Sequence, residues 1–228
     1  MERTTSTAPV SAAETAAPNH ILSHNGVNLF ERGFVHAIRS TAKNGKTQTL
    51  YRIAASALGA DVIGMKPTKP DTKVLYVTGS VAETNEANRN IQALTNDLTA
   101  DPDAYLYAKS VDGLSDNVIE IISTLSQFDA DLVIIDDICG MVSDPNHINC
   151  ACAVIDTLRR IARDSNIAII LTITEPHEGE AKGGLLEEIH LLSVEQYRPK
   201  KNDNTITLHH HQNKGGNNDF MPDITFTL

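Results

Sequence analysis

The sequence contains no tryptophan, and aromatic residues make up only 4% of its 228 positions. A hydrophobic core of this chain must therefore be built from Val, Ile, Leu and Ala, which suits a parallel β-sheet buried on both faces. Cysteine is also scarce: Cys139, Cys150 and Cys152 form an odd set, which favours reduced thiols over a disulfide framework. The segment from His147 to Cys152 is interpreted as a helix start rather than a metal site, because no second ligand pair lies nearby in the sequence.

Long apolar runs are missing as well. No stretch approaches the roughly 20 apolar residues that span a bilayer, so we expect no contact with a membrane. The first residues lack a basic start followed by an apolar stretch, so we expect no secretion signal and a cytoplasmic protein. Positively charged residues are also few: the chain has 19 Lys and Arg and 29 Asp and Glu, which gives a formal net charge of -10. This balance argues against broad nonspecific adhesion to nucleic acid, which needs a cationic surface.

The chain is predicted to be one ordered domain that follows a tail. Residues 1–20 are rich in Ala, Thr, Ser and Pro without periodicity, which predicts a disordered tail. Over 21–228, apolar strands alternate with helical segments, which predicts an α/β domain with a mostly parallel central sheet flanked by helices.

The expected elements follow from the apolar pattern. We expect a turn at Asn25-Gly26, and the parallel strands are expected at 33–39, 73–78, 104–108, 131–136 and 166–172. Helices are expected at 46–58, 82–98, 114–125 and from just after Pro145 to about 163. Three short strands at 191–196, 205–210 and 224–228, with a loop at 198–204, should extend the sheet in antiparallel fashion.

The most specific motif is Ser-Thr-Ala-Lys-Asn-Gly-Lys-Thr at 40–47. It matches the phosphate-binding pattern G-x-x-x-x-G-K-[ST] at every fixed position except the first, where Ser40 replaces glycine. In such loops, backbone N–H groups at the positive end of a helix hold phosphate oxygens. The pattern therefore predicts an ATP site formed by Ser40, Thr41, Ala42, Lys43, Asn44, Gly45, Lys46, Thr47 and Gln48.

Each part of this loop has an expected role. Lys46 should reach the terminal phosphates, the Thr47 hydroxyl should bind Mg²⁺, and Gly45 should allow close approach of the backbone. If the first position requires a positive φ, Ser40 costs about 1 kcal/mol or more and weakens the loop.

Two carboxylates follow the apolar strand at 131–136. They should lie at the C-terminal edge of a parallel sheet, where ligands of such folds bind. We expect Asp136 to hold Mg²⁺ through water, and Asp137 to touch the metal or polarise the attacking water. ATP hydrolysis also needs groups that orient water and sense the terminal phosphate, and the candidates are Glu83, Thr174 and Glu175. The predicted catalytic residues are Lys46, Asp137 and Glu83.

These residues resemble RecA-type P-loop ATPases of bacterial plasmids and mobile elements, a group related to RepA-like and replicative helicases. The matching stretches are 34–47, 74–78, 132–137, 167–175 and 209–220, so the resemblance covers about 21–228. It implies a RecA-like fold, ATP hydrolysis in DNA replication, mobilisation or repair, and assembly into a ring or helical homo-oligomer. Lys214 would correspond to the basic finger that reaches a neighbouring subunit's site.

The chain departs from this family at several positions. Ser80 stands where an acidic residue is usual, with Glu83 three residues further on, and Thr174 stands where Gln or His is common. Lys214 keeps a positive charge but lacks the planar fork of arginine. Together with Ser40, these departures predict slow hydrolysis or binding without turnover.

Two alternatives stay open. The first is a non-catalytic interaction module that keeps the fold and the nucleotide, which the departures at Ser40, Ser80 and Thr174 favour. The second is a small-molecule P-loop kinase. That alternative needs a lid with clustered arginines, whereas the segment 176–186 contains Lys182 and no arginine.

Overall fold

A computed structural model of the chain describes residues 19–95, 106–110, 123, 125, 127–142, 144, 146–175, 184, 188–189, 195–213 and 223–228. The predicted tail lies outside these residues except at its end, because the first strand already begins at His20. The predicted helix at 114–125 also lies almost entirely outside them.

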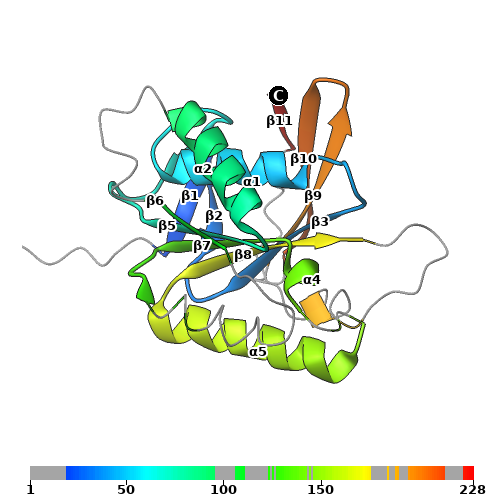
Figure 1. The fold of residues 1–228 in the computed structure, drawn as a ribbon. Coiled ribbons are helices and arrows are strands. Elements are labelled where there is room, and N and C mark those ends of the chain that lie inside the picture. Colours follow the sequence, from blue (N-terminus) through cyan, green and yellow to red (C-terminus); the bar gives the residue numbers. More distant parts are fainter. Residues whose placement is uncertain are drawn as a thin grey trace, which may run out of the picture.

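An eight-stranded sheet forms the centre, in the order β11-β10-β9-β3-β8-β7-β5-β6 (Figure 1). From β9 to β6 every neighbouring pair is parallel, whereas β9, β10 and β11 pair antiparallel. The strands are β3 (Val35–Ser40), β5 (Val74–Thr78), β6 (Leu106–Ser110), β7 (Leu132–Asp136), β8 (Ala168–Thr174), β9 (Glu195–Asn202), β10 (Thr205–Asn213) and β11 (Ile224–Thr227). The predicted α/β class, with a mostly parallel sheet and antiparallel C-terminal strands, is confirmed.

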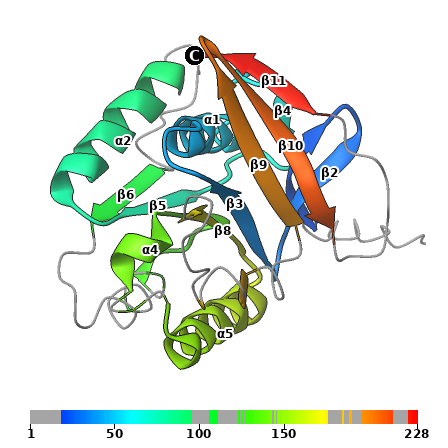
Figure 2. The same ribbon diagram turned by 90° about the vertical axis from the view of Figure 1, so that its right-hand side faces the viewer.

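Helices cover both faces of this sheet (Figures 1 and 2). The helices are α1 (Lys46–Ala57) and α2 (Val81–Thr95) on one face, and α4 (Ile138–Met141) and α5 (Ile148–Ser165) on the other. Successive residues of each central strand enter opposite cores, as Ile134 packs with the α1 side and Ile135 with the α5 side. Among the described residues, no helix is long and apolar enough to cross a membrane.

The helix predicted after Pro145 is confirmed as α5, and an apolar stripe along it is buried. Its buried members are Ala151, Val154, Ile155, Leu158 and Ala162, and Ile161 packs against them while partly buried. A stripe at this spacing faces one side of a helix, so it fixes α5 along the sheet.

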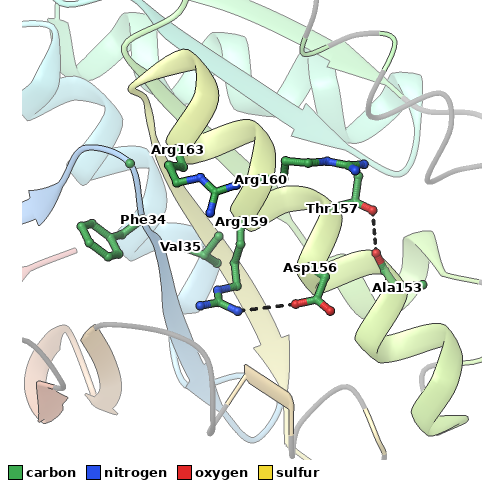
Figure 3. Close-up of a pocket in the computed structure, with 9 residues that line it drawn as sticks. Phe34, Val35, Ala153, Asp156, Thr157, Arg159, Arg160 and Arg163 are labelled. Carbon is green, nitrogen blue, oxygen red and sulfur yellow. Dashed lines mark hydrogen bonds and ion pairs between the residues drawn. The ribbon is translucent and has the colours of Figure 1, made fainter.

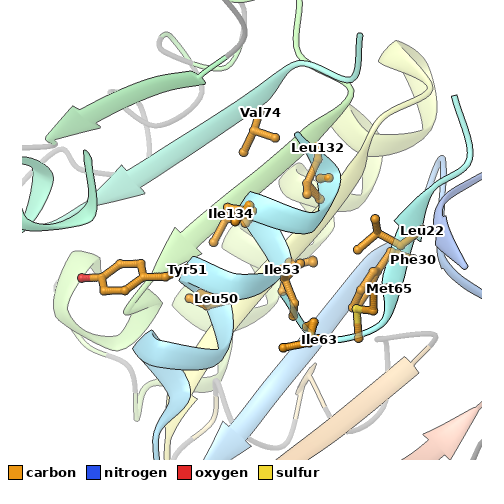
Figure 4. Close-up of a cluster of buried hydrophobic side chains, with 14 of the residues drawn as sticks. Leu22, Phe30, Leu50, Tyr51, Ile53, Ile63, Met65, Val74, Leu132 and Ile134 are labelled. Atoms are coloured by element: carbon orange, nitrogen blue, oxygen red, sulfur yellow. The ribbon is translucent and has the colours of Figure 1, made fainter. Parts of the chain in front are cut away.

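A small second sheet is a feature that the sequence patterns did not predict. It has the order β2-β1-β4 and comprises β1 (His20–His24), β2 (Val27–Glu31) and β4 (Met65–Pro67). The expected turn at Asn25-Gly26 is confirmed, with left-handed φ values of 49° and 82° that suit a two-residue hairpin. Leu22, Phe30 and Met65 from these strands join the core around α1 (Figure 4).

The loop predicted at 198–204 is wrong. β9 continues to Asn202, and only Asp203 and Asn204 turn the chain into β10. The prediction failed because Pro199 resembles a strand breaker. Pro199 lies beyond the two residues of β9 that pair with β3, so the structure requires no N–H donor from it on that side.

A buried ion pair joins β9 to β3. His36 Nδ1 lies 3.0 Å from Glu195 Oε2, and His36 Nε2 lies 2.9 Å from the carbonyl oxygen of Glu31. The same carboxylate oxygen accepts hydrogen bonds from the Phe30 N–H and the Tyr197 hydroxyl. Burial raises the pKa of Glu195, but His36 and these donors outweigh it, so the pKa is lowered overall.

Glu195→Gln should destabilise the fold, because it leaves His36 without its anionic partner. Breaking such a buried pair from one side costs about 3 kcal/mol, which lowers Tm by roughly 10 °C near neutral pH. The folded pKa of Glu195 is lowered, so its contribution to stability is present above the unfolded pKa and disappears as pH falls through the folded value. Circular dichroism melts should therefore show a difference in Tm that shrinks below about pH 4.

The matched control is Glu86→Gln, which removes an exposed carboxylate from α2 and should leave Tm unchanged. A difference between wild type and Glu195→Gln that stays constant from neutral to acidic pH would contradict the role given to this ion pair.

Candidate functional site

The loop between β3 and α1 differs from expectation at its first residue. Ser40 is the last residue of β3 and pairs with Thr174 of β8. The residues with left-handed φ are Lys43 at 66° and Gly45 at 83°. The condition for backbone strain at Ser40 is therefore not met, and the non-glycine residue in the left-handed region is Lys43.

Side chains and carbonyl groups hold this loop in shape. Asn44 Nδ2 donates to Thr41 Oγ1 at 2.6 Å, and Ser40 Oγ donates to the Thr41 carbonyl at 3.1 Å. The buried Lys46 ammonium turns back over the loop and donates to the carbonyl oxygens of Ser40 and Thr41 at 3.0 and 3.2 Å. Because these bonds are internal to the segment, the loop has a defined conformation of its own.

Gly45 marks the point where the loop meets the C-terminal strands. A Cβ atom at this position would collide with Cδ1 of Ile206 and lie 3.0 Å from its Cγ1. Gly45 is also the N-cap of α1, makes no side-chain cap hydrogen bond, and is followed by a first turn without acidic residues. The first N–H groups of a helix lack partners within it, so this end of α1 is suited to an anion.

Asp136 ends β7 and faces the loop. Its Oδ1 accepts from Thr172 Oγ1 at 2.7 Å and its Oδ2 from the Tyr76 hydroxyl at 3.0 Å. Burial raises the pKa of Asp136, and hydrogen bonds from Thr172, Thr47 and Tyr76 lower it less than burial raises it. A bound divalent cation would favour the ionised carboxylate at this position.

Asp137 lies beside it and is also well held. Its Oδ2 accepts from Thr174 Oγ1 at 2.6 Å, and its Oδ1 accepts from the Cys139 N–H at 3.0 Å, which caps α4. Burial lowers the pKa of Lys46, while the charges of Asp137 and Asp136 raise it to a smaller extent. The ammonium of Lys46 therefore interacts with both carboxylates as well as with the loop.

These groups meet in one pocket of about 540 Å³. Its lining consists of Ala42, Lys43, Gly45, Lys46, Thr47, Gln48, Asp136, Asp137, Thr174 and Lys201. The structure thus brings together most of the predicted loop and both predicted carboxylates. Ser40, Thr41 and Asn44 do not line the pocket, and instead form the hydrogen-bonded frame behind it.

The other predicted residues lie elsewhere. Glu83 is exposed in the first turn of α2, its N–H bonded to Ser80 Oγ, and it is not among the residues that line the pocket. Glu175 Oε1 lies 3.0 Å from Arg39 Nε and 2.9 Å from an Arg198 nitrogen, so it links β3 to β9. Lys214 lies outside the described residues.

Three residues of the site were missed by the sequence patterns. Tyr76 and Thr172 hold Asp136, and Lys201 lines the pocket from β9. A signal existed for Thr172, because it is a hydroxyl residue within an otherwise aliphatic strand next to the strand of Asp136. For Lys201 the signal was hidden by the predicted loop at 198–204.

A second pocket, of about 600 Å³, lies at the opposite end of β3 (Figure 3). Its lining includes Phe34, which precedes β3, and Arg159, Arg160 and Arg163 of α5. The ion pairs there are long and exposed, with Arg159 3.5 Å from Asp156. It offers neither buried carboxylates nor a helix N-terminus among its lining residues, so the pocket at Lys46 is the better candidate site.

Comparison with known proteins adds no family assignment, since no protein-family model and no curated protein matches the chain. Among the described residues, no group of three or more His, Cys, Asp or Glu could hold a metal ion. A cation at this site would therefore need ligands beyond such side chains, such as the Thr47 hydroxyl, water or phosphate oxygens.

Gly45→Ala should destabilise the protein for two reasons. A left-handed φ costs about 1 kcal/mol for alanine relative to glycine. In addition, the alanine Cβ would collide with the side chain of the fully buried Ile206. Gly26→Ala is the matched control, because Gly26 has nearly the same φ of 82° and no atom within 4 Å of the added Cβ. Urea unfolding should show a larger decrease in the free energy of unfolding for Gly45→Ala than for Gly26→Ala.

An Ile206→Ala background should reduce the cost of Gly45→Ala towards that of Gly26→Ala, because it removes the colliding atoms. Equal costs for the two glycine variants in the wild-type background would mean that the contact between the loop and Ile206 has no energetic weight.

Proposed function

We propose that this protein binds ATP together with Mg²⁺ and is a RecA-like P-loop ATPase with slow or impaired hydrolysis. The observation that carries the proposal is the single pocket in which the uncapped start of α1, the buried Lys46 ammonium and the Asp136 carboxylate meet. Opposite charges that line one pocket suit a ligand that has both anionic groups and a cation.

The residues present fit such a ligand. The N–H groups at the start of α1 would hold phosphate oxygens, and Lys46 would exchange its bonds to the loop carbonyls for bonds to the terminal phosphates. Thr47 and Asp136, which line the same pocket, would hold Mg²⁺ between them. The cation would supply charge neutralisation for the phosphates.

Slow turnover is supported by the other carboxylates, because each of them is already bonded or lies outside the pocket lining. Both oxygens of Asp137 accept hydrogen bonds, from Cys139 and Thr174, so orienting a water molecule would compete with existing bonds. Glu83 does not line the pocket, and Glu175 is paired with two arginines. Ser40 gives no reason for slow turnover, because its backbone lies in an ordinary strand conformation.

The resemblance to ATPases of mobile elements extends the proposal further. On that basis the protein acts in the cytoplasm, in DNA replication, mobilisation or repair, as a homo-oligomer. With a net charge of -10, contact with DNA would need a local cationic surface or a partner protein.

A non-catalytic module that binds the nucleotide without turnover is the second candidate. It is favoured by the hydrogen bond from Thr174 to Asp137, which ties that carboxylate to the sheet edge. Nucleotide binding without any phosphate release, with or without single-stranded DNA, would select this alternative.

Lys46→Ala should lower the affinity for ATP about 10- to 100-fold, the effect of losing a charge-assisted hydrogen bond. Isothermal titration calorimetry with ATP and Mg²⁺ measures it, and phosphate release with and without single-stranded DNA measures turnover. Lys66→Ala, which removes an exposed lysine on β4, is the control and should bind like wild type. Tight ATP binding by Lys46→Ala, equal to that of the control, would refute the proposed site.

Asp136→Asn should remove the dependence of ATP affinity on Mg²⁺. The amide keeps the size of the side chain and can still accept hydrogen bonds, but it lacks the charge that holds a divalent cation. The ATP affinity measured with Mg²⁺ should differ from that measured with a chelator for the wild type, and the two affinities should be equal for Asp136→Asn. An unchanged Mg²⁺ effect in Asp136→Asn would place the cation on other ligands.

A further inference from the structure

Lys201 is an exposed lysine that lines the same pocket as Lys46 but comes from the far end of the chain. It lies near the end of β9, immediately before the tight turn into β10. The pocket thus contains positive side chains from the phosphate loop and from the C-terminal hairpin.

The strand register fixes the side on which Lys201 lies. Lys201 and Ile206 are partners in the antiparallel pair of β9 and β10, and residues directly opposite each other project to the same face. Ile206 fills the space beside Gly45, so that face is the one directed at the phosphate loop. The adjacent Lys200 pairs with Thr207 and therefore projects to the other face.

The hairpin is also fastened to the rest of the site. Ile206 is fully buried, and Arg198 of β9 is bonded to Glu175, whose N–H donates to the carbonyl oxygen of Ser40. On the next strand, the Thr227 carbonyl accepts from Arg52 of α1 at 3.0 Å. These contacts hold Lys201 beside the loop without help from a second molecule.

The balance of charges among the residues that line the pocket indicates what Lys201 does. Asp136 and Asp137 oppose the ammonium of Lys46, which is buried and bonded to the loop carbonyls. A triphosphate carries more negative charge than one lysine and one Mg²⁺ offset, so a further cation stabilises it. From this geometry we infer that Lys201 is a second phosphate-binding residue, supplied to the site by its own chain.

This inference rests on the proposed nucleotide binding and adds a statement about partners. The resemblance to RecA-type ATPases assigns the additional cation to a neighbouring subunit through Lys214. The hairpin contacts instead complete the phosphate site in cis, so nucleotide affinity should not depend on assembly.

The test compares Lys201→Gln with Lys200→Gln, which removes the same charge one residue away on the opposite face. Binding of a non-hydrolysable ATP analogue with Mg²⁺ should weaken about tenfold or more for Lys201→Gln. It should change less than about twofold for Lys200→Gln, whose charge is exposed and screened by salt. Equal weakening in both variants would mean a general charge effect and would overturn the inference.

A mixing experiment separates action within one chain from action between chains. Lys46→Ala protein can donate an intact Lys201, and Lys201→Gln protein has an intact Lys46. If Lys201 acted on a neighbouring site, mixing the two would restore high-affinity sites. We expect no restoration, and the affinity should be independent of protein concentration. Restored binding would overturn the assignment in cis.

The outcomes also separate this inference from the proposed function. Wild-type protein that binds no ATP analogue would refute both, because the site itself would be absent. Wild-type protein that binds, loses binding in Lys46→Ala and is unaffected by Lys201→Gln would refute only the role of Lys201.

Discussion

The parallel pairing of β3, β8, β7 and β5 is the constraint on which the site depends. In-register pairing places Ser40 beside Thr174 and Thr78 beside Asp136, so the ends of these strands lie along one edge. The loop between β3 and α1 leaves this edge from β3, and the two carboxylates lie where β7 reaches it. Segments about 90 residues apart in the chain therefore meet at one edge of the sheet.

Several polar groups at this edge are arranged around the half-buried carboxylate of Asp136. Tyr76, Thr172 and Thr47 come from three different elements: the first two donate to Asp136, and Thr47 lowers its pKa. A buried carboxylate with such donors keeps a fixed orientation, which is what a cation ligand requires. The same arrangement explains why each of these neighbours is a hydroxyl residue: a second acid would add repulsion, and an aliphatic side chain would leave the carboxylate oxygens without donors.

The sequence predicted the parallel part of the fold well, because its strands are aliphatic runs. The start of α1 is marked by the Gly-Lys-Thr motif, and α5 has an apolar stripe along one face. It also predicted that Lys46, Thr47 and Asp136 would meet. It did not predict β1, β2 and β4, because these strands are short and β4 joins β1 from a distant segment of the chain. The extent of β9 was obscured by Pro199, and with it the position of Lys201. Such features depend on tertiary pairing rather than on local pattern.

The hydrogen bonds of Lys46 to the carbonyl oxygens of Ser40 and Thr41 have a consequence for selectivity. Two of the three N–H donors of the ammonium are already used by these carbonyl groups, so an anion that needs more than one of them must displace existing bonds. Only a ligand with dense negative charge recovers more than it disrupts. If the loop binds a nucleotide as proposed, its resting conformation would favour polyphosphates over carboxylates and monovalent anions.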